Sequence, residues 1–162
     1  MEFLDRANNV VMGLAPGRTP IHADFPGTLL YRDLALRLIT SAAKLVEHSD
    51  SQFRDELVSA FGEAFNNVAM HSYRDRSDGR VDLVIEFGSD WLRIDLTDTG
   101  RSFDPTTVTS PDLNLLPESG MGLFIIRSFV DELSYQPGPP NRLSMTKRVK
   151  AVAAGAKGAA YG

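Results

Sequence analysis

Three polar side chains recur at four-residue intervals in one segment of the chain: Glu63, Asn67 and His71. At about 100° per residue, positions four apart differ by only about 40° around a helix, so these side chains form one ridge. A carboxylate, an amide and an imidazole can transfer protons, ligate a metal ion and form hydrogen bonds. We interpret the ridge as one wall of a functional site. The alternative is that these side chains cap neighbouring loops.

The segment that carries this ridge, 50–73, has the pattern of an amphipathic helix. Its apolar residues repeat at helical spacing: Leu57, Phe61, Ala64, Phe65 and Val68. Such a stripe faces the core of a globular protein, and Ser49 or Asp50 can cap the start of the helix. The polar ridge borders the stripe rather than opposing it, so we expect the ridge at the edge of the core.

A half-buried antiparallel hairpin is predicted further along the chain by two runs of alternating apolar residues. The first run is Val81, Leu83, Ile85 and Phe87, and the second is Leu92, Ile94 and Leu96. Asp98 continues the apolar row of the second strand, and burying an acid is costly unless it is hydrogen-bonded. Asp98 therefore needs a partner. The alternative is that the strand ends at Thr97 and that Asp98 opens a turn with Gly100.

A long loop and a glycine-rich helix start follow the hairpin. The loop, 100–119, contains three prolines and few large apolar residues, and loops of this length in a compact domain are usually functional covers or mobile segments. It ends at Gly120 and Gly122, directly before an apolar helix. Glycines at a helix start let backbone N–H groups approach an anion, although this short motif is weak evidence by itself.

The rest of the chain is expected to complete one domain, 21–149. The pattern predicts an edge strand at 21–25, a helix at 29–48 and two closing strands at 133–136 and 143–149. Residues 1–20 are expected to form a flexible arm. The Ala- and Gly-rich segment 150–162 is expected to be a disordered tail.

Composition excludes several classes of function. A formal charge of −4 and a pI near 5.3 argue against direct nucleic-acid binding, which needs clustered Lys and Arg. With no cysteine in 162 residues, the chain has no disulfide framework and no thiolate metal site. It also lacks a secretory apolar region and a run long enough to cross a bilayer. These features predict a cytoplasmic protein with no membrane association.

The features resemble, in their order along the chain, the ATP-binding fold of the GHKL (Bergerat) superfamily. They are Glu63-x-x-x-Asn67 on a helix, Asp98-x-Gly100 after a strand, a Pro- and Thr-rich loop, and Gly120-x-Gly122 opening a helix. Within this superfamily the chain is similar to the anti-sigma-factor serine/threonine kinases of bacterial partner switching. The resemblance implies an α/β two-layer sandwich, with a mostly antiparallel sheet and helices on one face.

The resemblance also implies roles for individual residues. Asn67 would ligate a magnesium ion that bridges the ATP phosphates, and Glu63 would act as the general base. Asp98 would receive the exocyclic amino group of adenine. The other nucleotide-binding positions it implies are Gly100, Arg101, Gly120, Met121, Gly122, Leu123 and Thr146. Thr146 has the opposite strand parity to Leu143 and Met145, so its role requires those two to face elsewhere or a bulge.

By resemblance, the expected function is that of an anti-sigma factor that phosphorylates a serine or threonine on an anti-sigma antagonist. The implied partners are a sigma factor and that antagonist, with a homodimer also open, and Arg32 is a candidate for the partner contact. The alternative is an ATP-binding regulatory module that sequesters a partner but transfers little phosphate. Glu63 favours the kinase, because a pure binder needs no base.

Overall fold

The computed structural model describes residues 19–74, 76, 78–102 and 121–150. Most of the expected N-terminal arm, most of the long loop, Gly120 and most of the expected tail lie outside the described residues. Within the described residues, no helix combines the length and the apolar character that a membrane span requires.

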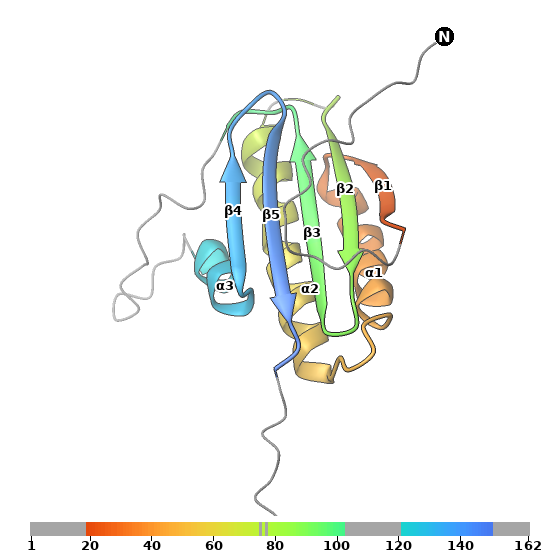
Figure 1. Ribbon diagram of the computed structural model, residues 1–162. Coiled ribbons are helices and arrows are strands. Elements are labelled where there is room, and N and C mark those ends of the chain that lie inside the picture. Colours follow the sequence, from red (N-terminus) through yellow and green to blue (C-terminus); the bar gives the residue numbers. More distant parts are fainter. Residues whose placement is uncertain (1–18, 75, 77, 103–120, 151–162) are drawn as a thin grey trace, which may run out of the picture.

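A five-stranded antiparallel sheet forms one layer of the domain (Figure 1). The strands are β1 (Ile21–Pro26), β2 (Arg80–Phe87), β3 (Trp91–Asp98), β4 (Glu132–Gln136) and β5 (Asn141–Arg148). Their spatial order is β1-β2-β3-β5-β4, and all four neighbouring pairs are antiparallel. The strand β3 therefore lies in the centre of the sheet, between β2 and β5.

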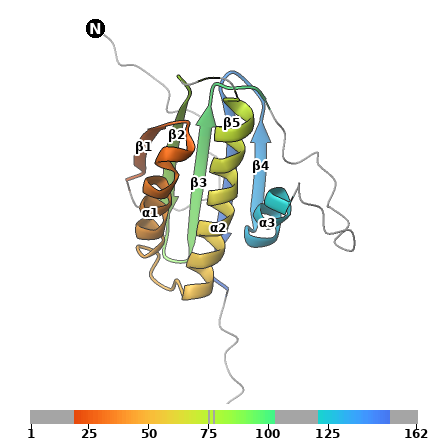
Figure 2. The ribbon, with the colours of Figure 1, turned by 180° about the vertical axis from the view of Figure 1, so that it is seen from behind.

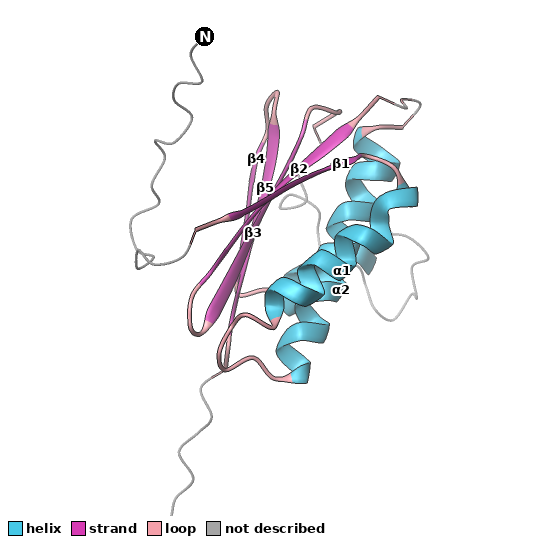
Figure 3. Ribbon diagram, turned by 90° about the vertical axis from the view of Figure 1, so that its right-hand side faces the viewer, coloured by secondary structure: helices cyan, strands magenta, loops and turns pink. Residues whose placement is uncertain are grey.

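The helices form the second layer, on one face of this sheet (Figures 2 and 3). They are a 3-10 turn η1 (Leu29–Tyr31), α1 (Arg32–Ala43), α2 (Ser51–Asn67), a π-helical turn η2 (Val68–Ser72) and α3 (Met121–Phe129). Asp50 caps α2, because its side chain accepts a hydrogen bond of 2.7 Å from the Phe53 N–H. The expected two-layer sandwich is confirmed.

The core lies between the layers and follows the predicted alternation. Val81, Leu83 and Ile85 of β2 face the helices, as do Leu92, Ile94 and Leu96 of β3, and all six are at most 1% exposed. From α2 the apolar stripe packs against them with Leu57, Phe61 and Phe65, each fully buried. This burial is the main favourable term for folding, at roughly 1.5–3 kcal/mol for each large side chain.

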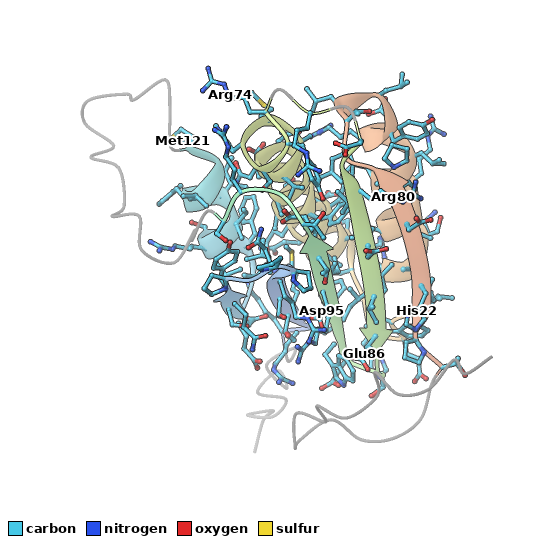
Figure 4. The ribbon with its side chains drawn as sticks, turned by 90° about the horizontal axis from the view of Figure 1, so that it is seen from above. His22, Arg74, Arg80, Glu86, Asp95 and Met121 are labelled. Carbon is cyan, nitrogen blue, oxygen red and sulfur yellow. The ribbon has the colours of Figure 1, made fainter. Side chains whose placement is uncertain are left out.

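The opposite face of the sheet is polar, and its charges are largely paired with one another. Figure 4 shows Asp95, Glu86 and His22 on the side away from the helices. On this face Arg93 donates to Asp95 at 2.9 Å, and Arg80 of β2 forms an ion pair with Asp24 of β1. Arg80 and Asp24 are more than half exposed, whereas the Arg93 and Asp95 side chains are only 16% and 14% exposed, so this face is solvated chiefly over β1 and β2.

Some element boundaries differ from those predicted. The first helix was expected to reach residue 48, but α1 ends at Ala43 and the chain continues in turns. The helix predicted over 50–73 is α-helical only as far as Asn67, where the π-helical turn begins. A π-helical turn inserts an extra residue per turn and often marks a functional site.

A buried lysine near the end of β5 connects three elements of the domain. Lys147 is 4% exposed, and its ammonium donates to Glu56 of α2 at 2.5 Å and to the Phe129 carbonyl at 2.6 Å. Phe129 ends α3, so this cation also satisfies a carbonyl at a helix C-terminus. The hydrogen bond from Lys147 holds the pKa of Glu56 below its usual value.

Replacing Glu56 with Gln should lower the free energy of unfolding by about 1–3 kcal/mol at neutral pH, because Lys147 loses its counter-charge. A lowered folded-state pKa stabilises the fold above the unfolded pKa and loses that contribution as the pH falls through the folded value. The difference between variant and wild type should therefore shrink in acid. Urea unfolding at a series of pH values measures it.

The matched control is Glu132→Gln, which removes the partner of Arg148. Both side chains of that pair are about half exposed, at 47% for Arg148 and 60% for Glu132. Exposed pairs contribute at most about 1 kcal/mol. Equal costs for the two variants, or a Glu56→Gln cost that does not change with pH, would contradict the assignment.

Candidate nucleotide site

The buried acid predicted at the end of the hairpin is in place. Asp98 is the last residue of β3 and is 5% exposed. Its Oδ1 accepts hydrogen bonds from the Gly100 N–H at 2.8 Å and from Asn141 Nδ2 at 3.1 Å, and the Ser72 side chain contributes a further bond. The strand thus continues through Asp98, and the carboxylate is held by donors from three separate segments.

Burial raises the pKa of Asp98, and the hydrogen bonds from Asn141, Gly100 and Ser72 oppose that rise. Desolvation disfavours the charged carboxylate, whereas donated hydrogen bonds favour it. A raised pKa in the folded state means that the fold gains stability as the pH falls through that value. The ionised carboxylate at neutral pH therefore costs folding free energy.

A pocket opens beside Asp98, between the end of α2 and the sheet. It has about 330 Å³ of empty space, a volume that includes the solvent at its open mouth. Its lining is mostly apolar, with three polar residues among seven: Ala64, Asn67, Val68, Ser72, Asp98, Tyr135 and Leu143. The structure therefore brings Asn67 and Asp98 together in one cavity.

Glu63 lies on α2 one helical turn before Asn67, and its carboxylate lies beside Gly122 at the start of α3. Adding a Cβ to Gly122 would place it 2.6 Å from Glu63 Oε2. Any side chain at position 122 would therefore displace this carboxylate. The close contact gives Gly122 a role in helix packing that the sequence did not indicate, in addition to the expected phosphate approach. The N-terminal end of a helix also favours a negative charge beside it.

The turn after Asp98 packs directly on the π-helical turn. A Cβ on Gly100 would lie 2.4 Å from the Ser72 carbonyl oxygen, so only glycine permits this approach. The Arg101 N–H donates to the same carbonyl at 3.0 Å, while the Arg101 side chain is exposed. Gly100 is thus needed for the contact between two backbone segments beside the pocket.

Sequence reasoning missed Asn141, the first residue of β5. It is 1% exposed, and its amide donates to Asp98 and to the Gly100 carbonyl at 3.0 Å. Its Oδ1 accepts from Ser102 Oγ at 2.7 Å and from the Gly138 N–H at 3.1 Å. A usable signal existed, because Asn141 shares the parity of the apolar positions in its strand.

The structure does not bring Thr146 to the pocket that contains Asp98. Thr146 pairs with Arg93 in the sheet, whereas Met145 pairs with Ile94, and the regular register contains no bulge. Thr146 therefore faces the side of the sheet away from Asp98. Leu143, which has the parity of Asp98, lines the pocket instead.

Leu123, Met121 and Arg32, which were also predicted to take part in binding, lie in three different environments. Leu123 is 7% exposed and belongs to the hydrophobic core, whereas Met121 at the start of α3 is 38% exposed and is labelled in Figure 4. Arg32 donates to Asn66 Oδ1 at 2.7 Å and lies across Gly62, so its guanidinium packs α1 against α2.

The domain has helices on one face of an antiparallel sheet, and an acid and an amide share a pocket between the two layers. This arrangement is that of the α/β class of ATPase-like folds. The family model described as "Histidine kinase-like ATPase domain" matches residues 25–147, and the chain belongs to this family. The expected superfamily is thereby confirmed.

Particular relatives are serine-protein kinases by name. The chain is 33% identical over 100 residues to "Serine-protein kinase RsbW" of Staphylococcus aureus, covering 56% of this chain and 63% of that protein. The same protein of strain MRSA252 is 32% identical. A solved structure of the RsbU and RsbW domains of a Mycobacterium tuberculosis protein matches with a TM-score of 0.59 at 17% identity. The match covers 81% of this chain and 32% of that one. At this identity the match supports the fold alone.

Replacing Asn141 with Leu should raise the pKa of Asp98 further, because the variant keeps the burial but removes a hydrogen bond to the carboxylate. Carboxyl ¹³C NMR of Asp98 across a pH titration measures this shift. Asn66→Leu, which removes the amide bonded to Arg32, is the control and should leave the titration of Asp98 unchanged. An unchanged Asp98 pKa in Asn141→Leu would show that this amide does not stabilise the carboxylate.

Proposed function

We propose that this protein is an ATP-dependent serine/threonine protein kinase of the partner-switching type, which also binds a regulatory protein partner. The observation that carries this proposal is the buried Asp98 carboxylate, which shares one pocket with Asn67. Family membership and the similarity to RsbW kinases support it. The chain spans 63% of the length of these relatives, so activity, substrate and partners are part of the proposal.

Asp98 is proposed to accept the exocyclic amino group of adenine. A fixed, desolvated acceptor suits a ligand donor, because a base without that donor leaves the carboxylate poorly paired. The apolar lining of the pocket, which includes Val68 and Leu143, suits the faces of an aromatic ring. Gly100 is proposed to permit the close approach of that ring.

Asn67 and Glu63 are proposed to serve the phosphate end of the nucleotide. Among the described residues, no group of three His, Cys, Asp or Glu side chains could hold a metal ion. A magnesium ion at this site would thus take its protein oxygen from Asn67 and its remaining ligands from phosphates and water, as this ion commonly does. When bound, it would neutralise phosphate charge. Glu63, one turn away, is proposed to accept the proton of a substrate hydroxyl.

The proposed partners are a sigma factor and an anti-sigma antagonist that carries the phosphorylated serine or threonine. Arg32 is proposed as a contact at the edge of this surface, despite its bond to Asn66. The proposed location is the cytoplasm, where such regulators act. A domain of residues 21–149 is proposed to suffice for nucleotide binding.

Asp98→Asn should weaken ATP binding by about five- to a hundredfold, because an amide N–H₂ would meet the donor of the base. The fold should remain intact, since the variant removes a buried charge whose pKa is raised by desolvation. Calorimetric titration with ATP and thermal unfolding measure the two effects. Asp95→Asn, on the opposite face of the same strand, is the control. Wild-type affinity in folded Asp98→Asn would remove the adenine assignment.

Glu63→Gln should retain nucleotide binding but slow phosphoryl transfer by roughly 10²–10⁴-fold, the usual cost of losing a general base. Transfer of the γ-phosphate to proteins captured by the chain can be followed with labelled ATP. Asp55→Asn, exposed on the same helix, controls for the loss of a carboxylate on α2. If wild type labels none of its captured partners, the sequestering module replaces the kinase as the better account.

A further inference from the structure

Tyr73 is a buried titratable residue to which the chemistry proposed above gives no role. It follows the π-helical turn directly, and only 2% of its surface is exposed. Its ring packs directly on two backbone segments, because a Cβ on Gly27 or on Gly79 would lie 2.4 or 2.3 Å from the ring atoms. Those two segments are joined by a hydrogen bond of 2.7 Å from the Gly27 N–H to the Gly79 carbonyl. The ring therefore packs where only glycine leaves room for it.

The phenolic oxygen of Tyr73 connects β2 to the turn after β3. It donates to the Arg80 carbonyl at 2.5 Å and accepts from the Thr99 N–H at 2.9 Å. The Thr99 N–H belongs to the peptide unit that joins Asp98 to Thr99. Holding this N–H fixes the plane of that peptide, and hence the backbone from which the Asp98 side chain projects.

A second hydrogen bond holds the same turn from the same helix end. The Arg101 N–H donates to the Ser72 carbonyl at 3.0 Å, and Gly100 packs on the Ser72 backbone. Tyr73 thus holds the Asp98–Thr99 peptide unit, and Ser72 holds the Gly100–Arg101 peptide unit. The Gly100 N–H, in turn, donates to Asp98 Oδ1 at 2.8 Å.

We propose that Tyr73 is a positioning residue for base recognition: its hydroxyl holds the Thr99 peptide so that the Asp98 carboxylate is aimed at the 6-amino group of a purine nucleotide. This inference rests on the proposed adenine role of Asp98. A carboxylate that is free to rotate loses more entropy on binding and forms a poorer hydrogen bond. The effect of Tyr73 should therefore depend on the 6-amino group and not on the phosphates.

The test compares ATP with purine riboside triphosphate, which lacks only the 6-amino group. In wild type, calorimetry should show ATP binding more tightly by about five- to a hundredfold. Tyr73→Phe keeps the ring packed on the two glycines and removes only the hydroxyl. It should weaken ATP by about three- to tenfold while changing the Kd of purine riboside triphosphate less than twofold, so the selectivity falls.

Two controls separate positioning from general loss of structure. Tyr31→Phe also deletes a hydroxyl from a ring packed against the core, and it should keep the wild-type selectivity. If Tyr73→Phe is unfolded at the assay temperature, Gly79→Ala takes its place, because the added Cβ displaces the ring. Gly88→Ala is its control, since that Cβ would lie 2.3 Å from Trp91 at the other end of the β2–β3 hairpin.

The possible outcomes distinguish this inference from the proposed function. Equal weakening of both nucleotides by Tyr73→Phe, or unchanged selectivity, would overturn the positioning role while leaving Asp98 as the base acceptor. Equal affinity of wild type for the two nucleotides would remove the adenine assignment of Asp98, and with it the positioning role. Reduced selectivity confined to Tyr73→Phe and Gly79→Ala supports the inference.

Discussion

The burial of one carboxylate in an otherwise apolar row is the constraint on which the site depends. Asp98 occupies the position after Leu92, Ile94 and Leu96 on the core face of the central strand. An acid there opposes folding, as its raised pKa indicates. Hydrogen-bond donors from the turn after β3, from β5 and from the π-helical turn surround Asp98 and oppose this cost. We therefore expect a role for the charge in binding rather than in stability.

The two ends of the domain are closed in different ways. At one end Lys147 satisfies both Glu56 and the last carbonyl of α3, so a buried charge joins three elements, and a smaller pocket lies beside this pair. At the other end Gly100 packs on the Ser72 backbone, and the Asn141 side chain bonds to the same turn. The pocket that contains Asn67 and Asp98 lies at this second end, where α2 becomes π-helical.

Local periodicity was enough to predict the layers and part of the site. The alternation in the hairpin predicted the parity of Asp98, and helical spacing predicted that Glu63 and Asn67 share a ridge. Both are properties of single elements, which short-range sequence determines. Thr146 was placed at the nucleotide by resemblance alone, although its strand parity is opposite to that of Leu143 and Met145. The register of β5 follows the parity.

Asn141 and Tyr73 could not be predicted in the same way, because their contacts join segments far apart in sequence. Asn141 follows a proline-rich turn and precedes the strand that alternation predicted, so its register against Asp98 was open. The environment of Tyr73 depends on the approach of Gly27 to Gly79. Strand parity indicates that Asn141 faces inward, but no local signal indicates which groups Asn141 or Tyr73 would meet. Tertiary packing decides which buried polar groups meet, whereas periodicity decides only which residues face inward.

The negative charge of Glu63 beside the start of α3 restricts how the phosphates of a nucleotide could bind there. The N-terminus of a helix attracts anions, and here Glu63 already lies beside Gly122. A triphosphate that approaches the same helix end therefore meets a carboxylate of like charge. The segment 102–119 contains no Lys or Arg to offset this repulsion, but it does contain Asp104, Asp112 and Glu118. Positive charge must come from outside that segment, and a divalent cation ligated by Asn67 would supply it next to Glu63. In this proposal the cation would neutralise the phosphates and would allow Glu63, the proposed general base, to remain close to them.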